Sequence, residues 1–140
     1  MVRPLPSRIL GAKVSGYDTN GLKLSWGATL SGNFYLYAGG VTDGAVSGLL
    51  DEDCYEWIPF KCKPTKLFVA TSSGDTDSTF GVYVNGSQVT TFTLSYSGQG
   101  YEVIDLSGDG LTFASDSRVA IKHESGTNTG KTRIQVHVTD

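Results

Sequence analysis

The chain has 140 residues, a length that fits one domain with a single hydrophobic core. It contains 18 Gly, 15 Ser and 15 Thr, while charged residues make up only 18% of it, and this composition favours short strands joined by tight turns. A hydrophobic content of 39% argues against intrinsic disorder. The formal net charge of −3 argues against a nucleic-acid partner, and no segment approaches the ~18 consecutive apolar residues of a membrane-spanning helix.

The charges are unevenly distributed along the chain. Residues 1–25 carry four basic and one acidic side chains, whereas residues 26–140 carry seven basic and thirteen acidic ones. Pro4 and Pro6 fix an extended backbone near the N-terminus. We therefore predict an extended basic arm over residues 1–16, followed by a β-sandwich over residues 17–140. Such an arm either docks onto a neighbouring protein or is an ordinary disordered end. Because the N-terminus lacks the apolar run of a secretory signal, we expect synthesis in a cytoplasm unless a signal has been removed.

The first half of the chain alternates between strand patterns and glycine-rich loops. Leu22–Trp26 has the period-two alternation of a half-buried strand, and an aromatic-rich segment follows at residues 33–38. Residues 39–50 read as a loop, and residues 51–54 as a further loop, with a single helical turn as the alternative. Tyr55–Phe60 is expected to be a strand. Thr65–Thr71 is nearly continuous in apolar residues, which predicts a strand buried deep inside a sandwich.

The second half contains the clearest strand and turn signals. Residues 78–84 and 88–96 flank Asn85-Gly86, the strongest short hairpin signal, because both positions accept a positive φ. Further strands are expected at residues 101–106, 118–123 and 131–138. Eight or nine strands and no helix-length amphipathic window predict an antiparallel β-sandwich of jelly-roll type.

No catalytic constellation is visible in the sequence. We expect His123 and His137 to face solvent on their strands. Asp75 and Asp77 alternate with hydroxyl residues in a way that suits calcium, but the pattern is too short for an EF-hand, so a solvated turn is the favoured interpretation. We expect no enzymatic activity.

The two cysteines give no metal site by themselves. Cys54 and Cys62 lie far from either histidine in the sequence, and we expect two buried free thiols, with a disulfide as the alternative. We expect no metal and no cofactor.

Aromatic side chains are the main candidates for contact with a ligand or partner. Tyr83 faces opposite to Phe80 and Val82 on its strand, so it lies either outside the sandwich or in a subunit interface. Exposed aromatic rings stack on sugar faces or bury against partners. The candidates are Tyr35, Tyr37, Trp57, Tyr83, Tyr96 and Tyr101.

The order of several motifs resembles the jelly-roll domains of tailed-bacteriophage virion proteins, such as capsid decoration proteins, head fibres and fibre heads. It is also loosely similar to the trimeric jelly rolls of the tumour necrosis factor and C1q type. The motif that usually reads Phe-x-Ala-Gly-Asp-x-Val in those families departs here at Ala114-Ser115-Asp116. The segments that carry the likeness, within residues 55–138, are Trp57-Ile58-Pro59-Phe60, Lys66-Leu67-Phe68-Val69-Ala70, Phe80-Gly81-Val82-Tyr83-Val84-Asn85-Gly86 and Leu111-Thr112-Phe113-Ala114-Ser115-Asp116-Ser117-Arg118-Val119-Ala120-Ile121-Lys122.

This resemblance implies a homotrimer on a virion surface. The N-terminal arm would then attach the domain to the major capsid protein or another virion component, through Arg3, Pro4, Leu5, Pro6, Arg8 and Ile9. The alternative hypothesis is a fibre-tip domain that binds a receptor or a host-surface glycan through exposed aromatic loops. An enzyme on a β scaffold is the third hypothesis and the least favoured.

Overall fold

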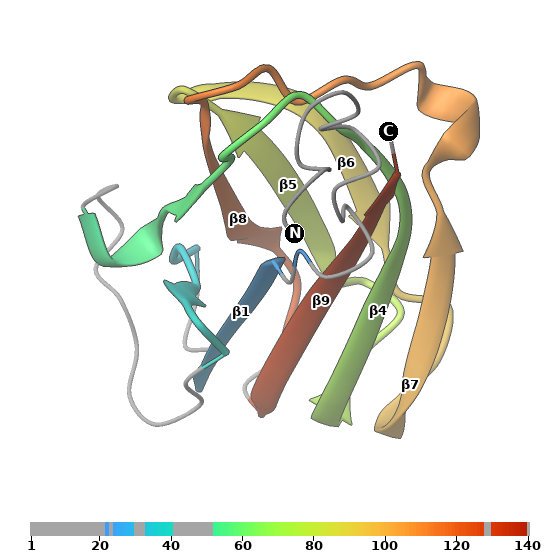
Figure 1. The fold of residues 1–140 in the computed structure, drawn as a ribbon. Helices are drawn as coiled ribbons and strands as arrows, with labels where there is room; N and C mark the ends of the chain where they lie inside the picture. The colour runs from blue at the N-terminus through green and yellow to red at the C-terminus, as the bar shows by residue number, and fades with distance from the viewer. Residues whose placement is uncertain (1–21, 23, 30–32, 41–51, 128–129, 140) are drawn as a thin grey trace, which may run out of the picture.

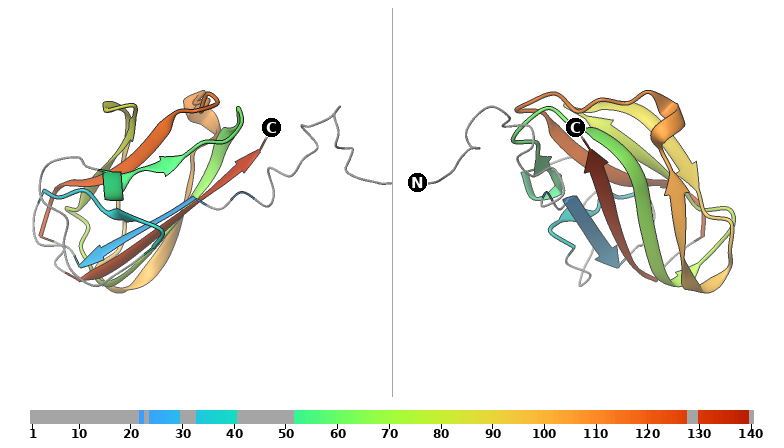
Figure 2. Two further views of the ribbon diagram at one scale, coloured as in Figure 1. Left: turned by 60° about the vertical axis from the view of Figure 1, so that its left-hand side comes forward. Right: turned by 45° about the vertical axis from the view of Figure 1, so that its right-hand side comes forward.

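A computed structural model describes residues 22, 24–29, 33–40, 52–127 and 130–139, which form nine strands and two short 3-10 turns in two facing antiparallel sheets (Figure 1). Figure 2 shows the two layers from the side. No helix of the described residues is long and apolar enough to cross a membrane. The strands are β1 (Leu24–Thr29), β2 (Tyr37–Ala38), β3 (Glu56–Trp57), β4 (Lys63–Gly74), β5 (Thr79–Val84), β6 (Ser87–Thr93), β7 (Gly98–Asp105), β8 (Arg118–Ser125) and β9 (Lys131–Thr139), and the 3-10 turns are η3 (Glu52–Cys54) and η4 (Ser107–Asp109).

The strand order is that of a jelly roll. One sheet has the order β2-β1-β9-β4-β7 and the other the order β3-β8-β5-β6. After β2 the chain changes sheet at every connection except the β5–β6 hairpin, which gives two interlocked Greek keys. The predicted fold class, an all-β sandwich of eight or nine strands, is confirmed.

The core lies between the sheets and is built from alternate side chains of both. Along β9, the buried residues Thr132, Ile134, Val136 and Val138 alternate with exposed ones. The Trp26 indole nitrogen donates a hydrogen bond of 3.1 Å to the Cys54 carbonyl, so β1 and η3 are tied together inside the protein. The largest fully buried side chains include Trp26, Phe80, Phe113, Leu67, Ile121 and Ile134.

The Asn85-Gly86 turn is confirmed by its backbone angles. Asn85 has a φ of 51° and Gly86 a φ of 88°, the two positive values of a tight hairpin turn between β5 and β6. The Asn85 side chain also accepts a 3.0 Å hydrogen bond from the Arg118 backbone amide, which joins the turn to the start of β8. Asn85-Gly86 therefore forms the hairpin turn, and Asn85 also binds the first residue of β8.

The strand predicted at residues 65–71 is confirmed as part of β4, but three details in the middle of the chain differ from the favoured predictions. β4 runs from Lys63 to Gly74 and is buried on one face only, because the five-stranded sheet is covered on its inner side alone. The expected strand at residues 55–60 shrinks to Glu56–Trp57, and Pro59 lies beyond it. Residues 52–54 form a 3-10 turn in place of the expected loop, because Cys54 is anchored in the interior.

The prediction that His123 faces solvent was also wrong. Its side chain is fully buried and its ring lies 5.1 Å from that of Phe80. On β8 the residues Val119, Ile121 and His123 follow at intervals of two, so the pleat places all three on the inner face. His137 does lie on an exposed position of β9.

Candidate binding surfaces

The outer face of the five-stranded sheet brings side chains from three distant strands into adjacent rows. In one row Val103 of β7 lies opposite Phe68 of β4, which lies opposite Gln135 of β9. In the next row Tyr101 lies opposite Ala70, which lies opposite Arg133. Tyr101 is 76% exposed and Val103 is 45% exposed, so the two form an apolar strip beside Phe68. We call this set of outward residues on β4, β7 and β9 the sheet face.

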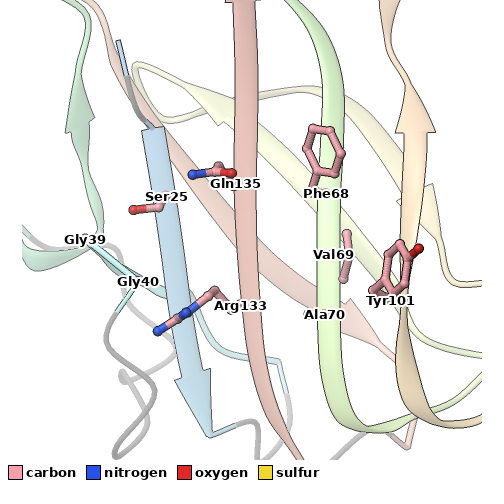
Figure 3. A pocket seen from close by; sticks show the side chains of 9 residues that line it. All are labelled: Ser25, Gly39, Gly40, Phe68, Val69, Ala70, Tyr101, Arg133 and Gln135. Atoms are coloured by element: carbon pink, nitrogen blue, oxygen red, sulfur yellow. The ribbon is translucent and has the colours of Figure 1, made fainter. Parts of the chain in front are cut away.

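The sheet face is hollowed along its length (Figure 3). A hollow of about 410 Å³ lies between Tyr101 at one side and Ser25 at the other, with Phe68 and Gln135 between them. A second hollow of about 500 Å³ shares Tyr101 and Arg133 and continues toward Ser72, Gln99 and Lys131. The two together make a shallow groove with an aromatic side and a basic side.

The charge of the sheet face is opposite to that of the rest of the domain. It carries Lys63, Lys66, Lys131 and Arg133 against Asp105. Hydrogen bonds from the hydroxyl and the backbone amide of Ser107 hold the pKa of the Asp105 carboxyl below its usual range. Outside this set, residues 26–140 carry three basic and twelve acidic side chains. Within the described part of the chain, the Arg133 guanidinium makes no hydrogen bond or ion pair.

The outer face of the four-stranded sheet carries a second, smaller cluster. Tyr35, Cys54 and Ala120 are buried there, with Tyr55 and Tyr83 packed against them. The Tyr35 and Tyr83 rings meet edge to face, with their centroids 5.4 Å apart. This cluster exists because residues 34–36 hydrogen-bond to β8 and bring Tyr35 over the sheet.

A polar network borders this cluster. The Tyr83 hydroxyl donates to Glu124, which also accepts from the Gln88 amide and lies 3.6 Å from the Lys122 ammonium. Partial burial and the bond to the Glu124 carboxylate raise the pKa of Tyr83 to about 12. Gly81 lies beneath, where a Cβ atom would come within 2.5 Å of a Glu124 oxygen. Because Gly81 has no side chain, the Tyr83 hydroxyl, the Glu124 carboxylate and the Gln88 amide can come together above it.

Arg118 and Trp57 form an exposed pair next to that cluster. Trp57 is 63% exposed and lies opposite Arg118 in the β3–β8 pairing. The Arg118 guanidinium carbon lies 4.7 Å from the centre of the Tyr55 ring and 5.7 Å from that of Trp57. Both distances fit cation–π attraction, which fixes the guanidinium between two rings.

The predicted aromatic residues are therefore divided between the two faces. Tyr101 lies on the sheet face and Trp57 on the opposite sheet, and these two are the exposed ones. Tyr35 is buried and Tyr83 is half-buried beside it, outside the sandwich core as expected. Tyr37, on β2, packs against the same cluster.

Tyr96 makes contacts within the domain that stabilise the fold. Its hydroxyl is 3.0 Å from the Thr71 hydroxyl and donates to the Gly100 carbonyl at 3.1 Å, while its ring covers Gly74. It therefore closes the end of the β4–β7 pair. The predicted attachment residues Arg3, Pro4, Leu5, Pro6, Arg8 and Ile9 lie outside the described residues.

Phe68, Arg133, Gln135 and Arg118 were not among the sequence candidates. The alternation along β9 does place Arg133, Gln135 and His137 on one face, and that signal is visible in the sequence. The neighbours on β4 and β7 are visible only once the strand order is known.

The acidic loop pairs with a second loop. Asp75 accepts a 2.6 Å hydrogen bond from the Thr127 hydroxyl, and Asp77 accepts a 3.0 Å bond from the Thr127 backbone amide. The first of these bonds lowers the pKa of Asp75. Among the described residues, no group of three or more His, Cys, Asp or Glu side chains is arranged to hold a metal ion. Cys54 and Cys62 are both buried and are not joined in a disulfide, as predicted.

Comparison of the chain with protein-family models, curated proteins and solved structures found no match. Functional inference therefore rests on the two faces themselves.

Proposed function

We propose that this chain is a non-enzymatic structural protein of a bacteriophage virion, of the capsid-decorating or head-fibre type, that assembles as a homotrimer. In this proposal the sandwich faces outward and the basic arm over residues 1–16 binds the major capsid protein or another virion component. Jelly rolls are a recurrent architecture of viral capsid domains, and the motif order described above points the same way.

The observation that carries the self-assembly is the apolar strip on the sheet face. Tyr101 and Val103 are two of the four large hydrophobic residues that are exposed in the described part of the chain, and both lie beside Phe68. The centre of a protein–protein interface is rich in aromatic residues and Arg and has a polar rim. The sheet face has this composition, with Arg133 and Gln135 next to the strip and Lys66 and Lys131 at its margins.

Charge favours a second copy of this chain as the occupant. The sheet face is basic, whereas the remainder of the domain is acidic. A contact between the basic face of one subunit and an acidic surface of the next is head-to-tail, and such contacts form a ring when the rotation between subunits closes and an open filament when it does not. A trimer is the small ring that the resemblance implies.

A matched pair of substitutions tests this role for the sheet face. Tyr101→Lys combined with Val103→Lys places two further cations in the strip, and we expect a monomer in size-exclusion chromatography with light scattering. Val89→Lys is the control, because Val89 is 41% exposed on β6 and lies on the other sheet. An unchanged mass for the double variant, or an equal loss of assembly in the control, would contradict the proposed interface.

A separate experiment tests the virion role. Purified particles that lack this protein are incubated with the full chain or with a chain without residues 1–16. We expect co-sedimentation with particles only for the full chain. Equal binding of both chains would contradict attachment through the arm, and binding of neither would contradict the role on particles.

A second candidate function is binding of a host-surface saccharide, favoured by Trp57 and Arg118. An aromatic ring that stays mostly exposed beside a fixed guanidinium offers a stacking face and hydrogen-bond donors together. This pair lies on the four-stranded sheet and is not part of the sheet face. Retention of the chain on a glycan array, lost in Trp57→Ala, tests it.

A further inference from the structure

We infer that Trp57, Arg118 and Asn85 form a site for a single sugar residue that carries a carboxylate, of the uronic or sialic acid class. This inference rests on the second candidate function and names its ligand. The three side chains come from β3, from the start of β8 and from the β5–β6 turn, so the fold itself brings them together.

The Arg118 guanidinium is positioned but has no polar partner of its own. It stacks between the Tyr55 and Trp57 rings, and its side chain makes no hydrogen bond or ion pair within the described residues. A guanidinium held in this way keeps its N–H edge available, and that edge matches the two oxygens of a carboxylate. Lys122, the neighbouring cation on the same face of β8, differs because it is already paired with Glu124 at 3.6 Å.

Trp57 and Asn85 supply the groups that a sugar ring needs. Trp57 presents an indole face large enough to stack on the C–H side of a pyranose ring. The Asn85 side-chain oxygen is held by the Arg118 backbone amide at 3.0 Å, so its NH₂ group remains as a donor for a hydroxyl. Stacking and directed hydrogen bonds together recognise a ring with polar substituents.

A peptide carboxylate fits this surface less well. Extended peptides gain affinity mainly by adding a strand to an open sheet edge. β3, the edge strand here, is only two residues long and offers few backbone groups. A platform made of one ring and one cation suits a ligand the size of one sugar residue.

Acidic side chains near the proposed site disfavour a ligand that carries many negative charges. Glu52 and Asp53 are exposed in the 3-10 turn just before Tyr55, and the Tyr55 amide donates to the Glu52 carbonyl at 3.4 Å. These carboxylates repel a polyanion more than they repel one carboxylate paired with Arg118. We therefore expect selection of a terminal acidic sugar over a densely sulfated polysaccharide.

The test is a titration of the full-length protein with glucuronic acid, N-acetylneuraminic acid, glucose and heparin, read by tryptophan fluorescence. The chain has two tryptophans, and Trp26 is fully buried, so a change in emission reports on Trp57. The expected result is binding of one or both acidic sugars at least about tenfold tighter than glucose, with heparin weaker than the best acidic sugar. Arg118→Gln is expected to remove that preference, while Lys122→Gln stays within about twofold of the unsubstituted chain.

Each outcome has a defined meaning. Equal binding of glucose and the acidic sugars, or unchanged acidic-sugar binding by Arg118→Gln, would overturn the carboxylate inference. If neutral sugars bind and Trp57→Ala removes that binding in a calorimetric titration, which does not depend on the emission of Trp57, the second candidate function stands without this inference. Tighter binding of heparin, or of an acidic peptide, would overturn the choice of ligand class. Binding of no saccharide would overturn both the inference and the candidate function. The emission of buried Trp26 checks that each variant remains folded.

Discussion

Gly126 lies at a position where an alanine meets two separate obstacles. Its φ is 113°, a backbone conformation that L side chains rarely adopt, and a Cβ atom there would lie 2.5 Å from the Ser78 Cα and 2.7 Å from the Asp77 carbonyl oxygen. The dihedral strain costs roughly 1–3 kcal/mol and the overpacking a further roughly 1–3 kcal/mol. We therefore expect Gly126→Ala to lower the free energy of unfolding by about 2–6 kcal/mol.

Gly86→Ala is the matched control for this substitution. Gly86 also has a positive φ, 88°, but no atom lies within 4 Å of the added Cβ. The Gly86→Ala substitution should therefore lower the free energy of unfolding only by the cost of the dihedral strain, about 1 kcal/mol. Urea unfolding of both variants, at one protein concentration because assembly shifts apparent stability, measures the difference. Equal losses in the two variants would refute the close approach of Gly126 to the segment just before β5.

Two further predictions concern titration and thiol chemistry. Because partial burial and the Glu124 bond raise the pKa of Tyr83 to about 12, the stabilisation from its neutral phenol is complete below about pH 10 and is lost as the pH rises through about 12. Burial also raises the pKa of Tyr35, so ultraviolet titration should show more than one tyrosine that ionises above the ordinary range. The component at about 12 should move toward the ordinary pKa in Glu124→Gln and be absent in Tyr83→Phe, and an undiminished component at about 12 in Tyr83→Phe would contradict the assignment. Cys54 and Cys62 are buried and form no disulfide, so a thiol reagent should find both cysteines only after unfolding. Fewer than two thiols under denaturing, non-reducing conditions would show that they are paired.

The strands that the sequence predicts best are those whose signal is entirely local. Asn85-Gly86 fixes its hairpin because few other dipeptides accept two positive φ values. β9 shows its inner and outer faces through strict alternation over nine residues. These features need no knowledge of the rest of the fold.

The errors arose because the polarity or hydrophobicity of a residue was given more weight than its position in the alternating pattern of its strand. His123 is polar, yet it continues the inward series of Val119 and Ile121, and its aromatic ring packs on Phe80. The continuous apolar run Leu67–Ala70 suggested burial on both sides of the strand, but the partner sheet covers only the side of Leu67 and Val69. In both cases the pleat, with its period of two, decided the outcome.

The sheet face could not be predicted from the sequence because its rows join residues that are far apart in the chain. Phe68, Val103 and Gln135 become neighbours only through the order β9-β4-β7. Trp57 and Arg118 meet in the same way across β3 and β8. The aromatic candidates Tyr101 and Trp57 were visible as residue types, but their partners and their separation onto opposite sheets depend on the topology.

The mass of the assembled protein in solution tests the central claim most directly. Sedimentation equilibrium of the full chain at micromolar concentration should give three times the chain mass of 14.9 kDa. A single species of 14.9 kDa, stable over a range of concentrations, would contradict self-assembly through the sheet face.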